Sequence, residues 1–284
     1  MSITITLIQT SQNRKDELTK FIHSLNNQNN INFSSIQLIF IDQGNNSKIF
    51  DNLCPYIDFK YIKTDKCSLS HARNLGIKHV KGKYIGFPDD DCWYEPDTLN
   101  MVLSILKEGK YQGVTGKGSD EKGTLTSIFP ICPSELTLTN RCAAISYTLF
   151  LKFDKTIKFD EDMGIGSPYN LGAGEETDYL LSLMEQKQYK VYYDPSISIH
   201  HPTSNIYSKS EILKRSYSYA RGAGYLMRKH NFSIDYIIKQ FIRPFGGIFI
   251  HFLKFDYFSC HRSYLIFKGK IEGYFWRKND NISR

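Results

Sequence analysis

The sequence predicts an α/β protein with a mostly parallel sheet flanked by helices. Residues 3–7 alternate between apolar and polar positions, as in a strand, and Leu18, Phe21, Ile22 and Leu25 then recur at helical spacing. The same alternation of strand and helix signals continues, with short connections, over roughly the first 110 residues. Such an order is typical of a parallel sheet whose connections cross back over its faces.

The other elements are predicted from apolar runs bounded by turn residues. The segment 113–174 is harder to assign, and we interpret its glycine-containing stretches 116–123 and 164–168 as loops. We expect strands over 37–41, 59–62, 84–87 and 190–193, and helices over 70–80, between Pro96 and Gly109, and from 175 onward.

Charge and aromatic residues are distributed unevenly along the 284 residues. Residues 1–200 hold 21 Lys and Arg against 24 Asp and Glu, whereas residues 201–284 hold 15 against 5, with 18 of the 40 aromatic residues. A basic, aromatic segment of this kind favours an anionic partner, either a membrane surface or a nucleic acid. We therefore expect one domain over 1–205 and a basic, aromatic, helical extension over 206–284.

Several signals indicate a cytosolic protein. Residues 2–8 lack the cationic start and the long apolar core of a signal peptide, and we interpret them as a strand. The most apolar stretch, 241–258, is interrupted by Arg243, Pro244 and Lys254, so no transmembrane helix is expected. The cysteines form no CxxC pair, which predicts reduced thiols. They are Cys54, Cys67, Cys92, Cys132, Cys142 and Cys260.

Three consecutive carboxylates, Asp89, Asp90 and Asp91, follow the strand predicted over 84–87. Because this position is the carboxyl end of a strand just before a helix, it lies at the sheet edge where α/β proteins bind ligands. Adjacent carboxylates repel one another unless a cation is present, and Mg²⁺ or Mn²⁺ prefers such oxygen ligands. The alternative is a solvated acidic turn. The buried strand favours a site for a metal and a phosphate group.

Two further groups have both a functional and a structural interpretation. Glu175, Glu176 and Asp178 open a predicted helix, where acidic side chains are also favoured by the helix dipole. The glycines that precede them allow close approach of a ligand. His200 and His201 lie in a predicted loop after the last strand. Such a pair is either exposed or, if it lies near the aspartates, a cation ligand.

Taken in order, these motifs resemble the inverting glycosyltransferases of family 2, which have the GT-A fold. The resemblance covers residues 3–202 and rests on the ordered set. Two positions depart from the family pattern: Gln43 replaces the second aspartate of an Asp-Asp-Gly-Ser turn, and Glu176 stands where aspartate is usual. The motifs are Thr10-Ser-Gln-Asn-Arg14, Asp42-Gln-Gly-Asn-Asn-Ser47, Ser70-His-Ala-Arg-Asn-Leu-Gly76, Gly82 to Asp91, Gly174-Glu-Glu-Thr-Asp178, and Tyr193 to His201.

The resemblance implies a role for the residues at matching positions. Glu176 would be the catalytic base, and Asp91 and His201 would bind the metal, with His200 as the alternative because the register is open by one residue. The implied cofactor is Mn²⁺ or Mg²⁺. The donor-binding residues would be Thr10, Arg14, Asp42, Arg73, Asp89 and Asp90, and the acceptor-side candidates are Trp93, Glu175 and Asp178.

By this resemblance, residues 1–205 would be a Rossmann-like GT-A catalytic domain. The activity would be that of a hexosyltransferase, which moves a sugar from a nucleotide-diphosphate sugar, with a UDP-sugar favoured, to a hydroxyl of a glycan. That glycan is expected to be lipid-linked, in the synthesis of a surface polysaccharide such as capsule or O-antigen. We therefore expect a cytoplasmic protein that is peripheral on the inner face of the cell membrane.

Two other classes of protein compete with this interpretation. A sugar nucleotidyltransferase would need a glycine-rich phosphate loop after the first strand, and residues 9–14 contain no glycine. A nucleic-acid-binding protein could stack the aromatic residues of the extension on bases. The helical spacing of these residues fits packing and membrane contact better, so no nucleic acid is expected as a partner.

Overall fold

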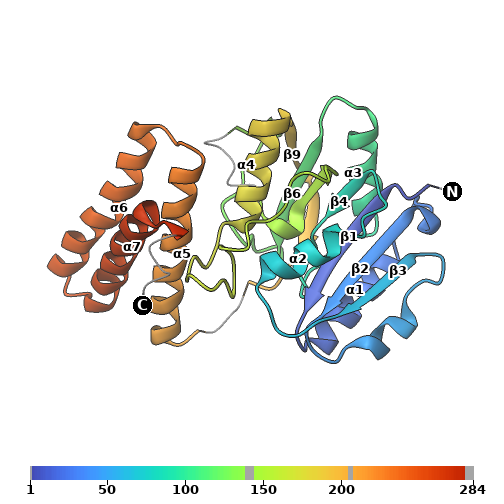
Figure 1. The fold of residues 1–284 in the computed structure, drawn as a ribbon, viewed down its shortest axis with the longest axis horizontal. Helices are drawn as coiled ribbons and strands as arrows, with labels where there is room; N and C mark the ends of the chain where they lie inside the picture. Colours follow the sequence, from blue (N-terminus) through green and yellow to red (C-terminus); the bar gives the residue numbers. More distant parts are fainter. Residues whose placement is uncertain (1, 138–143, 204–206, 279–284) are drawn as a thin grey trace. The chain divides into compact units, whose positions relative to one another are not determined.

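The computed structural model describes residues 2–137, 144–203 and 207–278, and it divides into two compact units (Figure 1). The first unit comprises residues 1–67, 71–159 and 179–205, and the second comprises residues 68–70, 160–178 and 206–284. The domain boundary expected at residue 205 stays a prediction, because residues 204–206 lie outside the described part. Cys142 also lies outside it, and the other five cysteines are free thiols.

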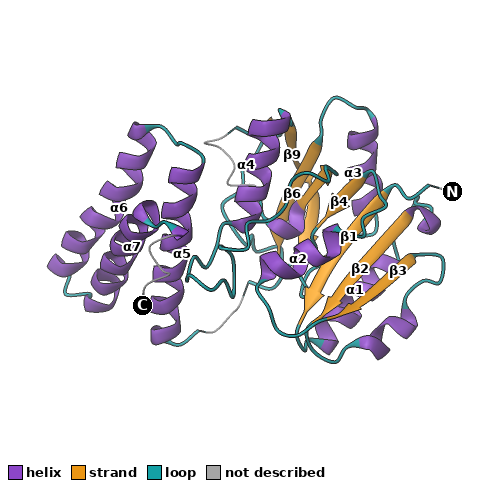
Figure 2. Ribbon diagram, in the orientation of Figure 1, coloured by secondary structure: helices purple, strands orange, loops and turns teal. Residues whose placement is uncertain are grey.

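The first unit is built on one sheet, which has nine strands among the described residues (Figure 2). The pairings among β1, β2, β3 and β4 are parallel, so the carboxyl ends of these strands meet at one edge. The other side is mixed, because β8 runs antiparallel to both β4 and β6. The order is β3-β2-β1-β4-β8-β6-β9-β5, with β7 beside β9. The strands are β1 (Ile5–Ser11), β2 (Ile36–Asp42), β3 (Asp58–Lys63), β4 (Tyr84–Gly86), β5 (Trp93–Tyr94), β6 (Gly113–Ser119), β7 (Ser134–Glu135), β8 (Leu149–Lys152) and β9 (Val191–His200).

Apolar side chains of the central strands point to both faces of the sheet and build a core on each. Leu7 and Leu38 belong to one core, with residues of α1 and α3, whereas Ile8 and Ile39 belong to the other, with residues of α2 and α4. Burial on both faces explains the apolar run over residues 38–41 in β2. The predicted α/β class is confirmed. The helices are α1 (Lys15–Asn26), α2 (Leu69–Ile77), α3 (Thr98–Lys107) and α4 (Glu175–Lys187), with 3₁₀ turns at Phe33–Ser35, Ser47–Asn52 and Ser146–Thr148.

The loop predicted over 116–123 is wrong in its first half, because residues 116–119 belong to strand β6. A Cβ at Gly116 would lie 2.3 Å from the carbonyl oxygen of Ile197, and one at Gly118 would lie 2.3 Å from the hydroxyl of Tyr147. These glycines therefore mark close approaches within the sheet, where a side chain has no room.

Strand β9 is also longer than predicted. The sequence predicts that it ends near Pro195 and leaves His200 in a loop, but β9 runs on to His200. A shift in the register with β6, between Thr115 and Lys117, accommodates the proline. The loop placement of His200 is thus wrong. The longer strand fixes the position of His201, which follows it directly.

Three helices dominate the second unit, as the expected helical extension predicts (Figure 1). The first of them begins at a capping box formed by Ser208 and Glu211. This first helix packs closely on the third helix, since a Cβ at Gly273 would lie 1.9 Å from the carbonyl oxygen of Arg221. In the described part of the chain, no helix is long and apolar enough to cross a membrane. The helices are α5 (Lys209–Lys229), α6 (Ile234–Leu253) and α7 (Tyr257–Phe275).

Ion pairs tie α5 to two other segments of the second unit. Lys229 Nζ lies 2.9 Å from Asp178 Oδ1 and 2.6 Å from Asp160 Oδ2. His230 Nε2 lies 2.8 Å from Asp178 Oδ1, and the Tyr225 hydroxyl donates to Asp160 Oδ2 at 2.8 Å. Burial lowers the pKa of Lys229, but the two carboxylates raise it above its ordinary value. Burial raises the pKa of Asp160, but Lys229 brings it below its usual range.

Replacing Lys229 with Met should destabilise the protein, because two carboxylates then lose a charged partner. We expect a loss of roughly 1.5–3 kcal/mol in the free energy of unfolding at pH 7. The folded pKa of Asp160 is lowered and that of Lys229 is raised. The stabilisation by these ion pairs is therefore complete between pH 3.8 and pH 10.5, the ordinary pKa values of the two groups. It is lost as the pH falls through the folded pKa of Asp160 or rises through that of Lys229.

Lys239→Met is the matched control, because the side chain of Lys239 is 78% exposed and lies 4.0 Å from Asp235. An exposed pair of this kind contributes little, so this variant should unfold at the wild-type urea concentration. Urea denaturation at several pH values measures both variants. Wild-type stability of Lys229→Met at pH 7 would contradict the role of these ion pairs.

Candidate active site

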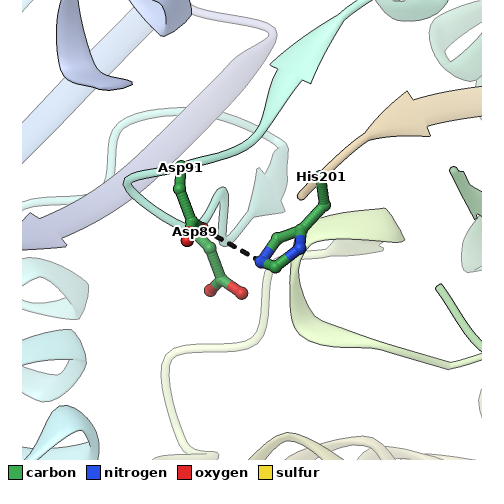
Figure 3. Close-up of side chains that lie close together, drawn as sticks. All are labelled: Asp89, Asp91 and His201. Atoms are coloured by element: carbon green, nitrogen blue, oxygen red, sulfur yellow. Dashed lines mark ion pairs between the residues drawn. The ribbon is translucent and has the colours of Figure 1, made fainter. Parts of the chain in front are cut away.

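Two aspartates and a histidine converge at the carboxyl edge of the sheet in the first unit (Figure 3). Asp89 and Asp91 lie between β4 and β5, and His201 directly follows β9. One potential ligand atom from each residue lies within 4.8 Å of the others. His201 Nε2 is 3.0 Å from Asp91 Oδ1, the contact drawn in Figure 3.

The orientation of His201 is fixed from three sides. Its backbone N–H donates to the carbonyl oxygen of Ser119 at 2.9 Å, and its ring stacks on Tyr147 with the ring centroids 4.7 Å apart. Its Nδ1 lies 2.8 Å from the carbonyl oxygen of Pro202. A proton on Nδ1 would satisfy that oxygen and leave Nε2, which faces the aspartates, as the coordinating atom.

A buried arginine positions Asp89. Arg73 is 2% exposed, lies near the rings of Phe87 and Phe159, and its Nη2 is 3.2 Å from Asp89 Oδ1. Ser146 Oγ donates to the same oxygen at 3.2 Å. Burial raises the pKa of Asp89, and the charges of Arg73 and His201 oppose this shift only in part. The carboxylate is therefore short of positive charge, as expected beside a cation site.

Arg14, just before α1, contacts the other two aspartates. Its Nη1 donates to Asp91 Oδ2 and lies 3.5 Å from Asp90 Oδ1. Burial raises the pKa of Asp90 to about 6, against the opposing charge of Arg14. Burial would also raise the pKa of Asp91, but His201 and Arg14 hold it below its usual range. Asp91 is thus the carboxylate kept ionised beside His201.

Asp42 and Thr10 lie at the ends of neighbouring strands of the parallel side. Asp42 is fully buried, and its carboxylate accepts hydrogen bonds from Gly44 N, from Asn46 N and Nδ2, and from the Tyr61 hydroxyl, at 2.6 to 2.8 Å. Burial raises its pKa, but these hydrogen bonds lower it below the usual range. Asp42 therefore organises the turn that follows β2.

Gln43, the residue that departs from the family pattern, braces this region. Its Nε2 donates to Thr10 Oγ1 at 2.9 Å, and its Oε1 accepts from the backbone N–H of Cys67 at 2.8 Å. An amide can do both at once because it has a donor and an acceptor, whereas an ionised carboxylate only accepts. The departure thus has a structural use at this position.

Trp93 lies in β5 at the wall of a pocket of about 700 Å³, which also includes Asp91 and Lys20. Lys20 Nζ lies 3.4 Å from the centroid of the Trp93 ring, and His200 stacks on this ring at 5.1 Å between centroids. His200 Nε2 also contacts the Glu95 carboxylate. The structure therefore places His201, and not His200, with the aspartates.

The three acidic residues at the start of α4 belong to the second unit. Glu175 is 4% exposed, and a Cβ at Gly164 would lie 3.1 Å from its carboxyl carbon. Asp178 forms ion pairs with Lys229 and His230, whereas Glu176 is half-buried.

The structure thus divides the residues named from the sequence between the two units. The first unit brings together Arg14, Arg73, Asp89, Asp90, Asp91 and His201, with Thr10 and Asp42 at strand ends and Trp93 at the pocket; the second unit holds Glu175, Glu176 and Asp178. Sequence reasoning missed Ser146, Tyr147 and Lys20. No motif marks these residues, and only the folded sheet and α1 bring them to the site.

Residues 6–140 match the family model described as glycosyl transferase family 2. This stretch of the chain matches a glycosyl transferase family 2 domain. This is the family predicted from the motifs, and it is distinct from the sugar nucleotidyltransferases considered as an alternative. One relative of this chain is the minor teichoic acid biosynthesis protein GgaB of Bacillus subtilis, 28% identical over 212 residues. The match covers 66% of this chain and only 23% of GgaB.

Solved structures with this fold confirm the GT-A class. Staphylococcus aureus TarS 1–349 superposes with a TM-score of 0.60 at 13% identity, over 97% of this chain and 93% of that chain. Its complex with UDP-GlcNAc gives 0.57 at 16% identity with the same coverage. The mannosyltransferase PcManGT of Pyrobaculum calidifontis, in complex with GDP-Man and Mn²⁺, gives 0.60 at 10% identity, over 97% of this chain and 88% of that one.

Replacing His201 with Ala should weaken Mn²⁺ binding by about tenfold or more, because one of three converging ligand atoms is lost. Replacing His200 with Ala is the matched control, since its ring faces Trp93 and Glu95 and should leave the affinity unchanged. The electron paramagnetic resonance signal of free Mn²⁺ measures both. A larger loss of Mn²⁺ affinity for the His200 variant would show that His200, and not His201, binds the metal.

Proposed function

We propose that this chain is a metal-dependent, inverting glycosyltransferase of hexosyltransferase type. It would move a sugar from a nucleotide-diphosphate sugar, with a UDP-sugar favoured, to a hydroxyl of a glycan acceptor. We further propose that the acceptor is lipid-linked and that the product belongs to a surface polysaccharide, capsule or O-antigen. The observation that carries the proposal is the convergence of Asp89, Asp91 and His201 at the carboxyl edge of the sheet.

The residues at this edge suit the diphosphate part of such a donor. Asp89 is held by Arg73 and Ser146, so it is positioned before any ligand arrives. The turn organised by Asp42 would receive the base, and Thr10, braced by Gln43, would line the same pocket. Arg14 and Asp90 would complete the donor side. Ligands of open α/β sheets bind at this edge, which supports the proposal.

The donor atoms of the site fit a divalent cation. Two carboxylates and one imidazole are ligands that Mn²⁺ accepts readily, and Mg²⁺ accepts the oxygens. Asp91 and His201 would hold the ion, with Asp89 beside them. When bound, such an ion neutralises the negative charge that develops on a departing diphosphate. Arg73 and Asp89 would orient the donor and keep the ligand side chains in place.

Glu176 is proposed as the general base. Its carboxylate would take the proton of the acceptor hydroxyl while that oxygen bonds to the anomeric carbon and the bond from this carbon to the diphosphate oxygen breaks. Attack from the face opposite the leaving group inverts the configuration. The half-buried position of Glu176, beside a buried Glu175, supports this assignment. Trp93, Glu175 and Asp178 remain acceptor-side candidates. Asp178 also forms ion pairs with Lys229 and His230 at the start of α4.

Replacing Glu176 with Gln should reduce the rate of sugar transfer by about 10²–10⁴-fold, because the amide cannot take the proton. The affinity for UDP should stay close to that of the wild type. Glu175→Gln is the matched control and should be milder. Release of the nucleotide in the presence of acceptor measures the rate. If Glu175→Gln were the damaging change, the assignment of the base would be off by one residue.

The second unit supports placement at a membrane surface. One face of α6 packs on α7, where Phe241 meets Phe267 and Tyr274 edge to face. Its remaining surface exposes large apolar side chains, with the cations Lys239 and Arg243 on the same helix. Such a helix can lie in the interface of an anionic bilayer. The exposed apolar residues of α6 are Ile234, Ile238, Ile242, Phe245, Phe249, Ile250, Phe252 and Leu253.

We predict that the full chain sediments with phosphatidylglycerol vesicles at low salt and that salt weakens this binding only in part. Salt screens the cations, but not the buried aromatic contact. Phe249→Ser with Phe252→Ser should weaken the part of the binding that resists salt. The matched control, Ile128→Ser with Ile131→Ser, removes two exposed apolar side chains of the first unit and should change nothing. A wild type that stays in the supernatant would show that α6 does not bind membranes.

A further inference from the structure

The second unit contains a pocket that the proposed chemistry does not use. It lies between α5 and α7, has a volume of about 450 Å³, and is lined by Arg215, Arg262 and Lys270, among other residues. We name it the α5–α7 pocket. Its walls are held by close helix packing, since a Cβ at Gly224 would lie 2.2 Å from the carbonyl oxygen of Lys270. The pocket is therefore preformed rather than opened by a ligand.

The two arginines of the pocket are oriented by neutral partners. Arg215 Nη2 donates to the Tyr219 hydroxyl at 2.6 Å, and its guanidinium lies 4.4 Å from the centroid of the Tyr207 ring. Arg262 Nε donates to Ser216 Oγ at 3.0 Å. Both side chains are thus held in position by hydrogen bonds to hydroxyl groups.

Lys270 is a cation of the pocket wall that is held by neutral oxygens. Its ammonium donates to the backbone and side-chain oxygens of Gln240 at 2.9 and 2.8 Å. Burial, and then the charge of Arg243, lowers its pKa to about 8. Within the described residues, none of Arg215, Arg262 and Lys270 forms an ion pair with a carboxylate. A bound anion would supply the missing charge.

The chemistry of the α5–α7 pocket favours a phosphate group that carries an organic substituent. Two guanidinium groups match the oxygens of a phosphate through paired hydrogen bonds. The wall also has an apolar part, which can cover carbon atoms of the same ligand. This part consists of Ile212, Ala220, Ala223 and Ile266.

The pocket adjoins the start of α4, where the proposed base lies. Gly172 N donates to the carbonyl oxygen of Ser218 at 3.1 Å, so the loop before α4 lies directly on α5. Burial raises the pKa of Tyr219 in the pocket wall, and the charges of Glu175 and Glu176 add to this shift. A ligand in the pocket would therefore lie near these carboxylates.

We infer that the α5–α7 pocket binds a phosphate group of the acceptor, so that the molecule whose hydroxyl meets Glu176 is phosphorylated. This inference rests on the proposed function, because it takes Glu176 as the base. The phosphate forms and breaks no covalent bond here. Arg215 and Arg262 hold it by charge-assisted hydrogen bonds, and its source is either a lipid phosphate or a soluble phosphorylated glycan.

The first test measures binding of inorganic pyrophosphate by calorimetry in EDTA, which keeps divalent cations from joining the probe to the aspartates. Arg215→Gln with Arg262→Gln should weaken this binding by more than about tenfold. The matched control is Lys214→Gln with Lys268→Gln, which also removes one cation from each of α5 and α7 but none that lines the pocket. The control should bind as the wild type does. No binding by the wild type, or equal losses in both variants, would overturn the inference.

A second measurement needs no variant and so does not depend on whether the double substitution folds. Pyrophosphate should slow the acylation of Lys270 by an amine reagent, as followed by mass spectrometry, and should leave Lys268 unaffected. Lys268 is a suitable internal reference, since it pairs with Glu272 at 3.8 Å and does not line the pocket. Unchanged labelling of Lys270 would contradict a phosphate site.

Two further comparisons distinguish a lipid phosphate from a soluble one and test the proposed function separately from the phosphate site. The first comparison measures binding to phosphatidylcholine vesicles with and without a polyprenyl phosphate. Stronger binding with the polyprenyl phosphate indicates a lipid phosphate, provided that Arg215→Gln with Arg262→Gln removes the difference. Binding of pyrophosphate without this gain indicates a soluble phosphorylated glycan. Hydrolysis of nucleotide sugars by the wild type is measured separately. Pyrophosphate binding without any such hydrolysis would refute the proposed function and leave the phosphate site standing.

Discussion

Two carboxylates, Asp89 and Asp91, face the same point at the edge of the sheet, and their repulsion has to be compensated. Arg73 supplies a buried positive charge to Asp89, Arg14 supplies one to Asp91, and His201 Nε2 lies 3.0 Å from Asp91. These partners come from the loop before α1, from α2 and from the end of β9. The need to balance two negative charges at one point thus links distant segments of the first unit, and it also creates the place where a cation fits.

The sequence predicts the parallel side of the sheet well because its signals are local. Each strand there is an apolar run followed by a turn, and the aspartates and helix starts follow directly from it. The mixed side could not be predicted in this way. Gly116 and Gly118 are typical of a loop, but they lie in β6. Glycine is needed at both positions because neighbouring backbone and side chains leave no room for a Cβ. Pro195 is typical of a strand end, but the register shift accommodates it and brings His201 to the aspartates.

The second unit shows how side chains far apart in sequence can define a site that no motif marks. Residues 160–178 belong to this unit, and the ion pairs of Lys229 with Asp160 and Asp178 join them to α5. The same helix supplies Arg215 to the α5–α7 pocket. The start of α4, with Glu176, is thus built together with the pocket proposed for the acceptor phosphate, whereas the metal ligands belong to the first unit.

A metal-dependent transfer with inversion can be tested by following the anomeric configuration of the sugar. The wild-type chain is incubated with UDP-, GDP- and dTDP-sugars, with Mn²⁺ or with EDTA, and the first product is observed by proton NMR. We expect release of the nucleotide from one donor class, with Mn²⁺ only, and a first product whose anomeric configuration is opposite to that of the donor. A product with retained configuration, or equal release in EDTA, would contradict it.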